Sequence, residues 1–302
     1  MAARNSTERC RKQLHTKYGK EAGTMNLGQS CPIARLAKIL VATERSAFSE
    51  GAVREAINLA KKCSSTLYVM SVVETNPEYE TIGAEFLQKE EQEAVQYLKS
   101  IKTRASEEML TCEVFLRRGD SPSRLIVEEA NQKKTDMIVI GRRGRRGLEK
   151  VLLGSAAAKV IGHAPCKVLV VPKAARIECK NILVATDGSE YADKAVAEAI
   201  EIAKQCGSRL IAVSVIHAEE GKEKAEANVG GVVSAAQKAG VAIETTTPIG
   251  KPYEVISETS AGRGVDLIVM GTYGKTGLKK LLMGSTTEKV IGMAGCAVLV
   301  VK

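Results

Sequence analysis

The sequence predicts an α/β protein of two tandem domains, each a doubly wound, five-stranded parallel sheet of the flavodoxin-like or Rossmann-like kind. Three observations lead to this prediction. The chain has 302 residues, about twice the usual length of a single domain. One half of the chain repeats the other. In both halves short β-branched runs alternate with longer helical patterns, which is typical of βαβ units around a parallel sheet.

The repeat is clearest near the end of each half. Residues 148–171 align without gaps to residues 278–301, and 15 of the 24 paired residues are identical. The match extends back to the apolar runs that begin at Lys38 and Asn181. A repeated unit of this length is a whole domain, because solenoid repeats run to about 20–50 residues.

The repeat divides the chain into residues 1–37, 38–172 and 173–302. The last two parts are the expected domains. The first is expected to be a flexible basic tail, because it carries seven Lys and Arg residues against two acids and so holds more than half of the net charge of +9. The whole chain has 3 Phe, 7 Tyr and no Trp, which leaves few rings for stacking nucleic-acid bases. We expect no nucleic-acid partner.

Nothing in the sequence has the length and composition of a membrane or secretion segment. No run approaches the roughly 18 apolar residues of a membrane span, and the first 37 residues hold no apolar stretch of signal-peptide length. We expect a cytoplasmic protein with no membrane partner and with its eight cysteines reduced. Cys63 and Cys206 occupy matching positions, as do Cys166 and Cys296, so duplication explains half of them. No zinc-site spacing is present.

Strands and helices can be placed in order along the second domain. Its expected strands are residues 182–186, 210–216, 242–247, 266–270 and 297–301. All but the third are nearly continuous apolar runs, as in a sheet covered on both faces. Between the first two strands apolar residues recur at helical spacing, namely Ala192, Val196, Ala199, Ala203 and Cys206. Gly207 follows, where a left-handed cap is favoured. An equivalent helix is expected after Ser49 in the first domain.

Candidate binding residues follow the first and fourth strands, whose carboxyl ends form the ligand crevice of such a fold. Glycines directly after a strand allow close approach of a ligand, and the amides of the turn bind anionic oxygens. Ser285 and Glu288 have capping-box spacing at the start of a predicted helix, whose amides add a second anion site. Asp187 is placed to bond a ribose hydroxyl. Each feature alone is an ordinary turn or cap, but together they predict a nucleotide-phosphate site.

Three motifs of the second domain together carry a resemblance to the universal stress protein family, in particular to its ATP-binding subgroup. They are Gly271-x2-Gly274-x9-Gly284-Ser285, Ala185-Thr186-Asp187-Gly188-Ser189 and Gly250-Lys251-Pro252. The glycine spacing recurs in the first domain as Gly141-x2-Gly144-x9-Gly154-Ser155. The resemblance covers residues 38–302.

The resemblance implies a small domain, similar to the adenine nucleotide alpha hydrolases, that binds ATP or AMP and serves in stress survival or regulation. Members of the family dimerise through the last strand. The resemblance therefore implies an internal pair of the two domains in this chain, and a homodimer of the whole chain stays open. Mg²⁺, where present, would be bound through the phosphates.

The same resemblance implies two groups of contacts in the second domain. Around the base and ribose it places Ala185, Thr186, Asp187 and Val215. Around the ribose and phosphates it places Gly271, Gly274, Gly284, Ser285, Thr286 and Thr287.

The first domain departs from the family pattern. Glu44 replaces the Asp, Arg45 replaces the following Gly, and three alanines follow Ser155. Arginines surround Gly144, and guanidinium groups bind phosphate well; they are Arg142, Arg143, Arg145 and Arg146. A second nucleotide or anion site there would comprise Ala42, Thr43, Glu44, Val72, Gly141, Arg143, Gly144, Gly154 and Ser155. Weak nucleotide binding, a different anionic ligand and a purely structural role all stay open.

The sequence offers few groups for catalysis. A phosphotransferase or hydrolase needs a positioned base or nucleophile, and Asp187 is the only acid repeatedly implicated in the second crevice. We expect a regulatory nucleotide-binding module more than an enzyme, with a slow ATPase and a partner-binding scaffold as alternatives. The regulatory partner is not identified. The first domain has 12 more residues between its second and third strands. Its charged stretch Glu85–Glu108 either covers the crevice, reaches a partner or is an ordinary longer helix.

Overall fold

Strands and helices alternate along both domains of the computed structural model, which describes residues 31–33, 36–75, 83–144, 153–216, 221–275 and 282–302. The elements of the first domain are β1 (Lys38–Ala42), α2 (Glu50–Cys63), β2 (Thr66–Glu74), α4 (Ala84–Glu107), β3 (Cys112–Gly119), α5 (Pro122–Lys133), β4 (Met137–Gly141), α6 (Ser155–His163) and β5 (Lys167–Val171). Those of the second are β6 (Asn181–Ala185), α7 (Glu190–Cys206), β7 (Arg209–Val213), α8 (Lys222–Ala239), β8 (Ile243–Thr246), α9 (Pro252–Gly262), β9 (Leu267–Gly271), α10 (Ser285–Met293) and β10 (Ala297–Val301).

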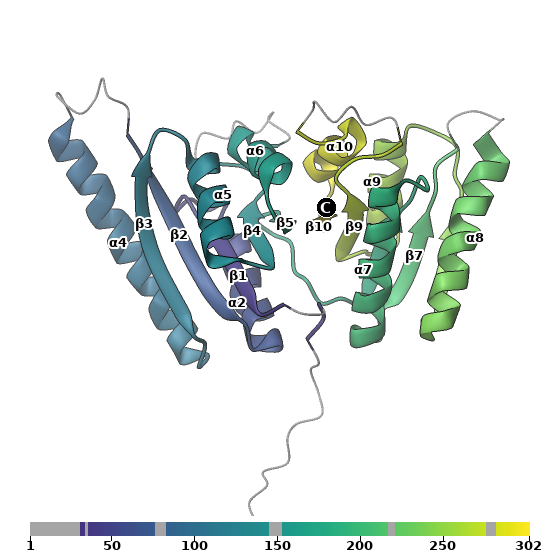
Figure 1. Cartoon of the computed structure of the whole chain (residues 1–302), viewed down its shortest axis with the longest axis horizontal. Coiled ribbons are helices and arrows are strands. Elements are labelled where there is room, and N and C mark those ends of the chain that lie inside the picture. The colour runs from purple at the N-terminus through teal and green to yellow at the C-terminus, as the bar shows by residue number, and fades with distance from the viewer. Residues whose placement is uncertain (1–30, 34–35, 76–82, 145–152, 217–220, 276–281) are drawn as a thin grey trace, which may run out of the picture. The chain divides into compact units, whose positions relative to one another are not determined.

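The strands of both domains form one sheet in the order β3-β2-β1-β4-β5-β10-β9-β6-β7-β8. Within each domain the pairings are parallel. The chain runs outward from β1 to β3 and then returns to β4, and it repeats this path from β6 (Figure 1). This topology confirms the predicted pair of doubly wound domains, and it makes the ends of β1 with β4, and of β6 with β9, adjacent.

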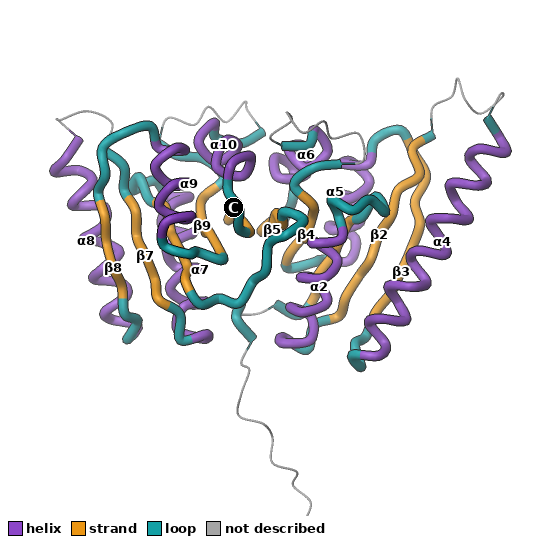
Figure 2. Tube along the Cα trace, turned by 180° about the vertical axis from the view of Figure 1, so that it is seen from behind, coloured by secondary structure: helices purple, strands orange, loops and turns teal. Residues whose placement is uncertain are grey.

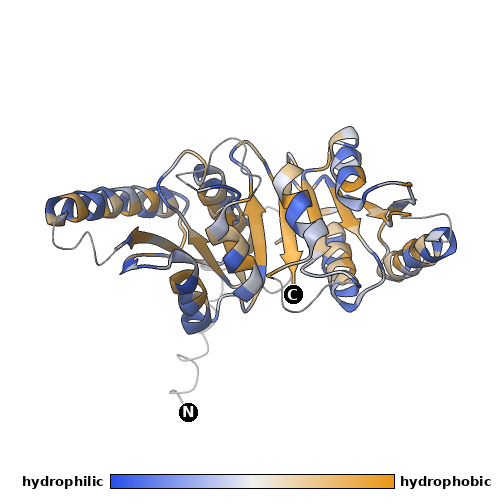
Figure 3. Ribbon diagram, turned by 90° about the horizontal axis from the view of Figure 1, so that it is seen from above, coloured by the Kyte–Doolittle hydropathy of each residue, from blue (hydrophilic) through white to orange (hydrophobic). Residues whose placement is uncertain are grey.

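Helices cover both faces of the sheet (Figure 2). Side chains alternate between the faces along a strand, so Ile39 and Val41 join the cluster under α2 and α4, whereas Leu40 joins the cluster under α5 and α6. The second domain continues both clusters under α7 with α8 and under α9 with α10. Figure 3 shows the apolar strands between helices with hydrophilic outer faces. Among the described helices, none is long and apolar enough to cross a bilayer.

The two domains meet at their last strands, as the family resemblance implies. β5 and β10 pair antiparallel with Leu169 opposite Leu299. Beside this pairing, Lys167 Nζ donates to Glu198 Oε1 at 2.6 Å. Lys302 Nζ donates to the carbonyl oxygens of Ile161 and of Gly162, where the bond is 3.1 Å. A cation at the end of α6 satisfies carbonyls that the helix itself leaves without a partner.

The segment between the domains lies against α2. Glu55, with 1% of its surface exposed, accepts a hydrogen bond from the backbone N–H of Ile177 at 3.2 Å and one from Arg54 Nε at 2.8 Å. Burial raises the pKa of the Glu55 carboxyl, while the bond from Ile177 acts in the opposite direction. At Gly51 a Cβ would lie 2.7 Å from the Pro172 carbonyl oxygen, so only glycine allows the connecting segment to approach so closely.

The described residues of the expected tail pack on the first domain. Ile33 and Leu36 are each 3% exposed and belong to its apolar core. Cys31 forms a disulfide with Cys63, at a Cα–Cα distance of 4.2 Å. The prediction that every cysteine is reduced is therefore wrong for this pair. The chain enters β1 beside the end of α2, which brings together two cysteines 32 residues apart. The rest of the tail, residues 1–30 and 34–35, lies outside the described residues.

Candidate functional site

The two predicted loops of the second domain meet at the carboxyl ends of β6 and β9. Asp187 joins them. Its Oδ1 accepts a hydrogen bond from the Ser189 N–H at 3.0 Å, and its Oδ2 accepts one from the Lys275 N–H at 2.7 Å. A carboxylate has about four lone-pair positions, so Asp187 retains acceptor capacity for a ligand hydroxyl after making both bonds.

Three glycines of these loops make room for close contacts. Gly188 has φ +70°, and a Cβ there would lie 2.3 Å from Asn228 Oδ1. At Gly274 a Cβ would lie 2.6 Å from Asp187 Oδ2. At Gly271 it would lie 2.7 Å from the backbone carbonyl of Tyr191. The glycine pattern therefore allows the two loops and α7 to approach one another, and backbone lines this end of the sheet.

The start of α10 differs from the predicted capping box. The helix begins at Ser285, its N-cap is Gly284, and no side chain of the described residues caps it. Ser285 is therefore already inside the helix and cannot act as its cap, so the capping-box prediction is wrong. The Gly284 N–H donates instead to the Thr272 carbonyl at 2.9 Å. This bond places the first turn of α10 directly above the loop that follows β9.

The hydroxyl residues of α10 are not equivalent. Ser285 is exposed and Thr286 is half-buried, so both side chains can reach a ligand at the helix start. Thr287 is 3% exposed, and its Oγ1 donates to the Gly271 carbonyl at 2.9 Å. Thr287 therefore fixes α10 to the end of β9, whereas its predicted role was to hold phosphate.

The residues predicted around the base lie at the ends of β6 and β7. Ala185 and Val215 are half-buried, and Thr186 is buried. The Thr186 hydroxyl accepts a hydrogen bond from the Gly188 N–H at 3.1 Å, which shapes the loop. Asn228 of α8, which the sequence did not single out, donates from Nδ2 to Ser214 Oγ at 3.1 Å. It brings an amide group next to Gly188.

A mostly apolar groove of about 380 Å³ runs between α7 and α8 and opens beside this loop. Thr186, Gly188 and Asn228 line its polar end, and Val196, Ile200 and Val232 line the rest, with several small residues of α8 between them. The sequence did not predict it, although the consecutive Gly230 and Gly231 of α8 were a signal that this helix leaves space at its surface.

In the first domain the matching loop is covered by α4. Arg45 has φ +67° and its side chain is 8% exposed. Its guanidinium donates to the Glu90 carbonyl oxygen at 2.6 Å and pairs with the Glu90 carboxylate. Of the three interpretations of the charged stretch Glu85–Glu108, this contact supports the one in which the helix covers the crevice.

The remaining predicted residues of the first domain are only partly brought together. Glu44 Oε1 accepts a hydrogen bond from Ser46 Oγ at 2.6 Å, and a Cβ at Gly144 would lie 3.4 Å from Glu44 Oε2. The Thr43 and Ser49 hydroxyls bond to each other at 2.9 Å. Others occupy the positions matching the second domain at the ends of β1, β2 and β4 and at the start of α6: Ala42, Val72, Gly141, Gly154 and Ser155.

The two described arginines after β4 have different surroundings. Arg142 donates from Nη1 to the Ala294 carbonyl at 2.6 Å, across the junction with the second domain, and burial lowers its pKa. The Arg142 guanidinium therefore binds a backbone carbonyl, whereas from the sequence alone it was considered as a ligand for phosphate. Arg143 is half-buried, and its Nε is buried with no hydrogen-bond partner among the described residues. Arg145 and Arg146 lie outside the described residues.

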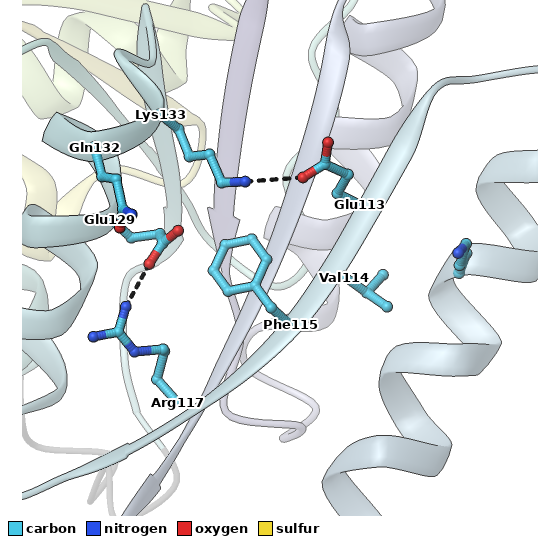
Figure 4. Close-up of a pocket in the computed structure, with 8 residues that line it drawn as sticks. Glu113, Val114, Phe115, Arg117, Glu129, Gln132 and Lys133 are labelled. Atoms are coloured by element: carbon cyan, nitrogen blue, oxygen red, sulfur yellow. Dashed lines mark hydrogen bonds and ion pairs between the residues drawn. The ribbon is translucent and has the colours of Figure 1, made fainter.

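A second hollow, of about 440 Å³, is lined by residues of β3 and α5 and by Lys102 of α4 (Figure 4). Lys133 Nζ pairs with Glu113 at 2.9 Å and Arg117 with Glu129 at 2.6 Å, on either side of Phe115. These paired charges make it a weaker candidate than the crevice. Over the described ranges no cluster of His, Cys, Asp and Glu residues suits a metal ion.

Comparisons with known proteins agree with the resemblance. A profile of the universal stress protein family matches residues 36–172 and 178–302. Universal stress protein MJ0531 of Methanocaldococcus jannaschii is 40% identical over 144 residues, which cover 45% of this chain and 82% of that protein. Universal stress protein Sll1388 of Synechocystis is 34% identical over 149 residues, covering 44% and 96%. The crystal structure of a universal stress protein from Archaeoglobus fulgidus has the same fold, with a TM-score of 0.73, 23% identity and coverage of 88% of this chain and 96% of that one.

Proposed function

This chain belongs to the universal stress protein family, and on that premise we propose that its second domain binds ATP or AMP as a cytoplasmic regulatory module for stress survival. The observation that carries the proposal is the contact of Asp187 with both loops, beside a helix start that none of the described side chains caps. Backbone amides, two accessible hydroxyls and one carboxylate thus surround one end of the sheet.

The residues present suit such a ligand. The amides in the first turn of α10 and the hydroxyls of Ser285 and Thr286 would bind phosphate oxygens, since a helix N-terminus favours negative charge. Asp187 would accept a bond from a ribose hydroxyl. Ala185 and Val215, both half-buried, would contact the base. A bound Mg²⁺ would neutralise phosphate charge, and no protein ligand for it is proposed.

The first domain is proposed as the weaker site. Arg45 and Glu90 fill the space beside its first loop, and alanines replace the hydroxyl residues that follow Ser155. Its loops are tied to α4 and, through Arg142, to the second domain. We assign it mainly to supporting the second domain through the β5–β10 pairing.

Hydrolysis is not part of the proposal. Hydrolysis needs a general base that accepts a proton from the attacking water, and the proposal assigns Asp187 to the two loops and to the ribose hydroxyl, with no second acid assigned as that base. A slow ATPase and a scaffold without nucleotide binding are the alternatives that the experiment below separates.

The proposal is tested by titration calorimetry of the full chain with ATP and with AMP. Gly284→Asp places a negative charge at the start of α10 and should weaken binding at least about tenfold. Gly154→Asp makes the same change at the matching position of the first domain and should leave affinity within about twofold. Thermal melting of both variants checks that they fold.

Three other results would favour the alternatives to this proposal. Loss of binding in Gly154→Asp alone would assign the site to the first domain and contradict the proposal. Absence of heat and of any ligand-induced rise in melting temperature in the unmodified chain would leave the scaffold. Steady phosphate release that Gly284→Asp abolishes would establish the ATPase.

A further inference from the structure

Each domain has a cysteine at the end of its first helix, at the sheet edge opposite the crevice. α2 ends at Cys63 and α7 ends at Cys206, and each is followed by a left-handed residue, Ser64 with φ 52° and Gly207 with φ 65°. The next residue in each case, a serine, donates its hydroxyl to the chain entering the first strand of that domain. The left-handed cap and the serine hydrogen bond that follow the two cysteines are therefore the same in both domains.

Both cysteines have a sulfur partner, supplied from different positions. In the first domain Cys63 is bonded to Cys31. In the second domain the Cys179 carbonyl oxygen accepts the bond from Ser208 Oγ, which brings Cys179 to this helix end, where its thiol interacts with that of Cys206. In the alignment of the two repeats Cys179 is matched by Leu36, which lies five residues after Cys31. The disulfide of the first domain shows that this helix end can hold a sulfur–sulfur bond.

The two thiols of the second domain differ in exposure and acidity. Cys206 is exposed and Cys179 is buried. The hydrogen bond from Cys179 lowers the pKa of Cys206, and the positive charge of Lys62 on α2 and a bond from Ser208 act in the same direction, against burial and the charge of Asp266. The pKa of Cys179 is raised, first by its bond to Cys206 and then by burial. This is the arrangement of an attacking thiolate beside a resolving thiol.

We propose that Cys206 and Cys179 are a peroxide-sensitive pair that closes a second disulfide, tying the chain before β6 to the end of α7. The Cys206 thiolate attacks one oxygen of hydrogen peroxide, the O–O bond breaks, hydroxide leaves, and Cys206 becomes a sulfenic acid. The Cys179 sulfur then attacks the sulfenic sulfur. The S–S bond forms as the S–O bond breaks, and the oxygen leaves as water with the Cys179 proton. Two thiols are oxidised by two electrons, and one peroxide is reduced.

The pair lies beside the segment that joins the two domains, so oxidation of the pair would constrain the chain where it enters β6. Cys179 follows the segment that Glu55 of α2 holds through Ile177. Its own N–H donates to Asp266 Oδ1 at 2.7 Å. A disulfide there would fix the entry of β6 to α7, as Cys31–Cys63 fixes the entry of β1 to α2.

The test uses the full chain after mild reduction, treated with stoichiometric hydrogen peroxide and analysed by peptide mass mapping. The expected product is a cross-linked peptide pair containing Cys179 and Cys206, lighter by two hydrogens. With Cys179→Ala, Cys206 should stop at the sulfenic acid, which dimedone traps. With Cys206→Ser, Cys179 should remain a thiol. Cys296 is the internal control, because burial raises its pKa to about 11 and it should not react.

A kinetic measurement separates this role from mere packing. Iodoacetamide should modify Cys206 at neutral pH at least about tenfold faster than Cys112, since burial raises the pKa of Cys112 to about 11. Cys179→Ala should slow modification of Cys206, because the donor to its thiolate is gone. The proposal is overturned if peroxide leaves Cys206 uncross-linked in the unmodified chain, or if Cys112 and Cys296 react as fast as Cys206.

Discussion

Removal of the Asp187 carboxylate should destabilise the second domain even without ligand. Its oxygens accept the Ser189 N–H at 3.0 Å and the Lys275 N–H at 2.7 Å. A hydrogen bond to a charged group contributes about 1.5–3 kcal/mol. Asp187 is half-buried, so water replaces part of this loss. We therefore expect Asp187→Ala to lower the free energy of unfolding by about 1–3 kcal/mol in total.

Urea denaturation followed by far-ultraviolet circular dichroism measures this change. Asp187→Asn keeps one acceptor oxygen and should lose less stability than Asp187→Ala. Glu128→Ala removes an exposed acid whose ion pair with Arg124 spans 3.9 Å, and it should change stability by less than about 0.5 kcal/mol. If Asp187→Ala is as stable as the Glu128 control, the carboxylate does not hold the loops together and the reasoning about the site is refuted.

Two further changes test the packing of the domains. Gly271→Ala would place a Cβ 2.7 Å from the Tyr191 carbonyl and should lower the free energy of unfolding by about 1–3 kcal/mol. Gly230→Ala would place a Cβ with no atom of the described residues within 4 Å and should raise the free energy of unfolding by about 0.5–1 kcal/mol. Equal changes for the two variants in urea denaturation would contradict the close contact at Gly271. Because the folded-state pKa of Glu55 is raised from 4.5, its contribution is largest below that pH and declines above it. The stability of the unmodified chain relative to Glu55→Gln should therefore fall as pH rises toward neutrality, and a constant difference would show that burial does not control this carboxyl.

The contact between the two loops at Asp187 was predictable, because the order of the strands follows from the βαβ pattern. Once β6 and β9 are neighbours, the segments after them share one edge of the sheet. The predicted strand Asp266–Met270 is observed as Leu267–Gly271, a shift of one residue. Asp266 instead accepts bonds from the N–H groups of Cys179, Lys180 and Asn181, a role that no local pattern reveals.

Side-chain partners across long distances were not predictable. Ser285 and Glu288 have capping-box spacing, but Gly284 takes the cap position because its N–H bonds the Thr272 carbonyl. Arg142 has the composition of an anion site, but its direction is set by the Ala294 carbonyl in the other domain. Each outcome depends on tertiary neighbours that spacing along the chain does not specify.

One backbone position accounts for much of the difference between the domains. Gly188 and the matching Arg45 both have positive φ, +70° and +67°. Glycine adopts this conformation without strain, whereas an ordinary residue loses about 1–2 kcal/mol. In the second domain the absent side chain leaves room for Asn228. In the first, Arg45 adopts this conformation while its guanidinium pairs with Glu90 and covers the loop.

The most direct test of the central claim counts nucleotides on the folded chain. Native mass spectrometry of the full protein with ATP or AMP should show one added nucleotide, which Gly284→Asp removes and Gly154→Asp retains. Two added nucleotides would show that the covering of the first loop by Arg45 and Glu90 does not close that site. No added nucleotide at any concentration at which the protein stays folded would contradict the assignment of the second domain as a nucleotide-binding module.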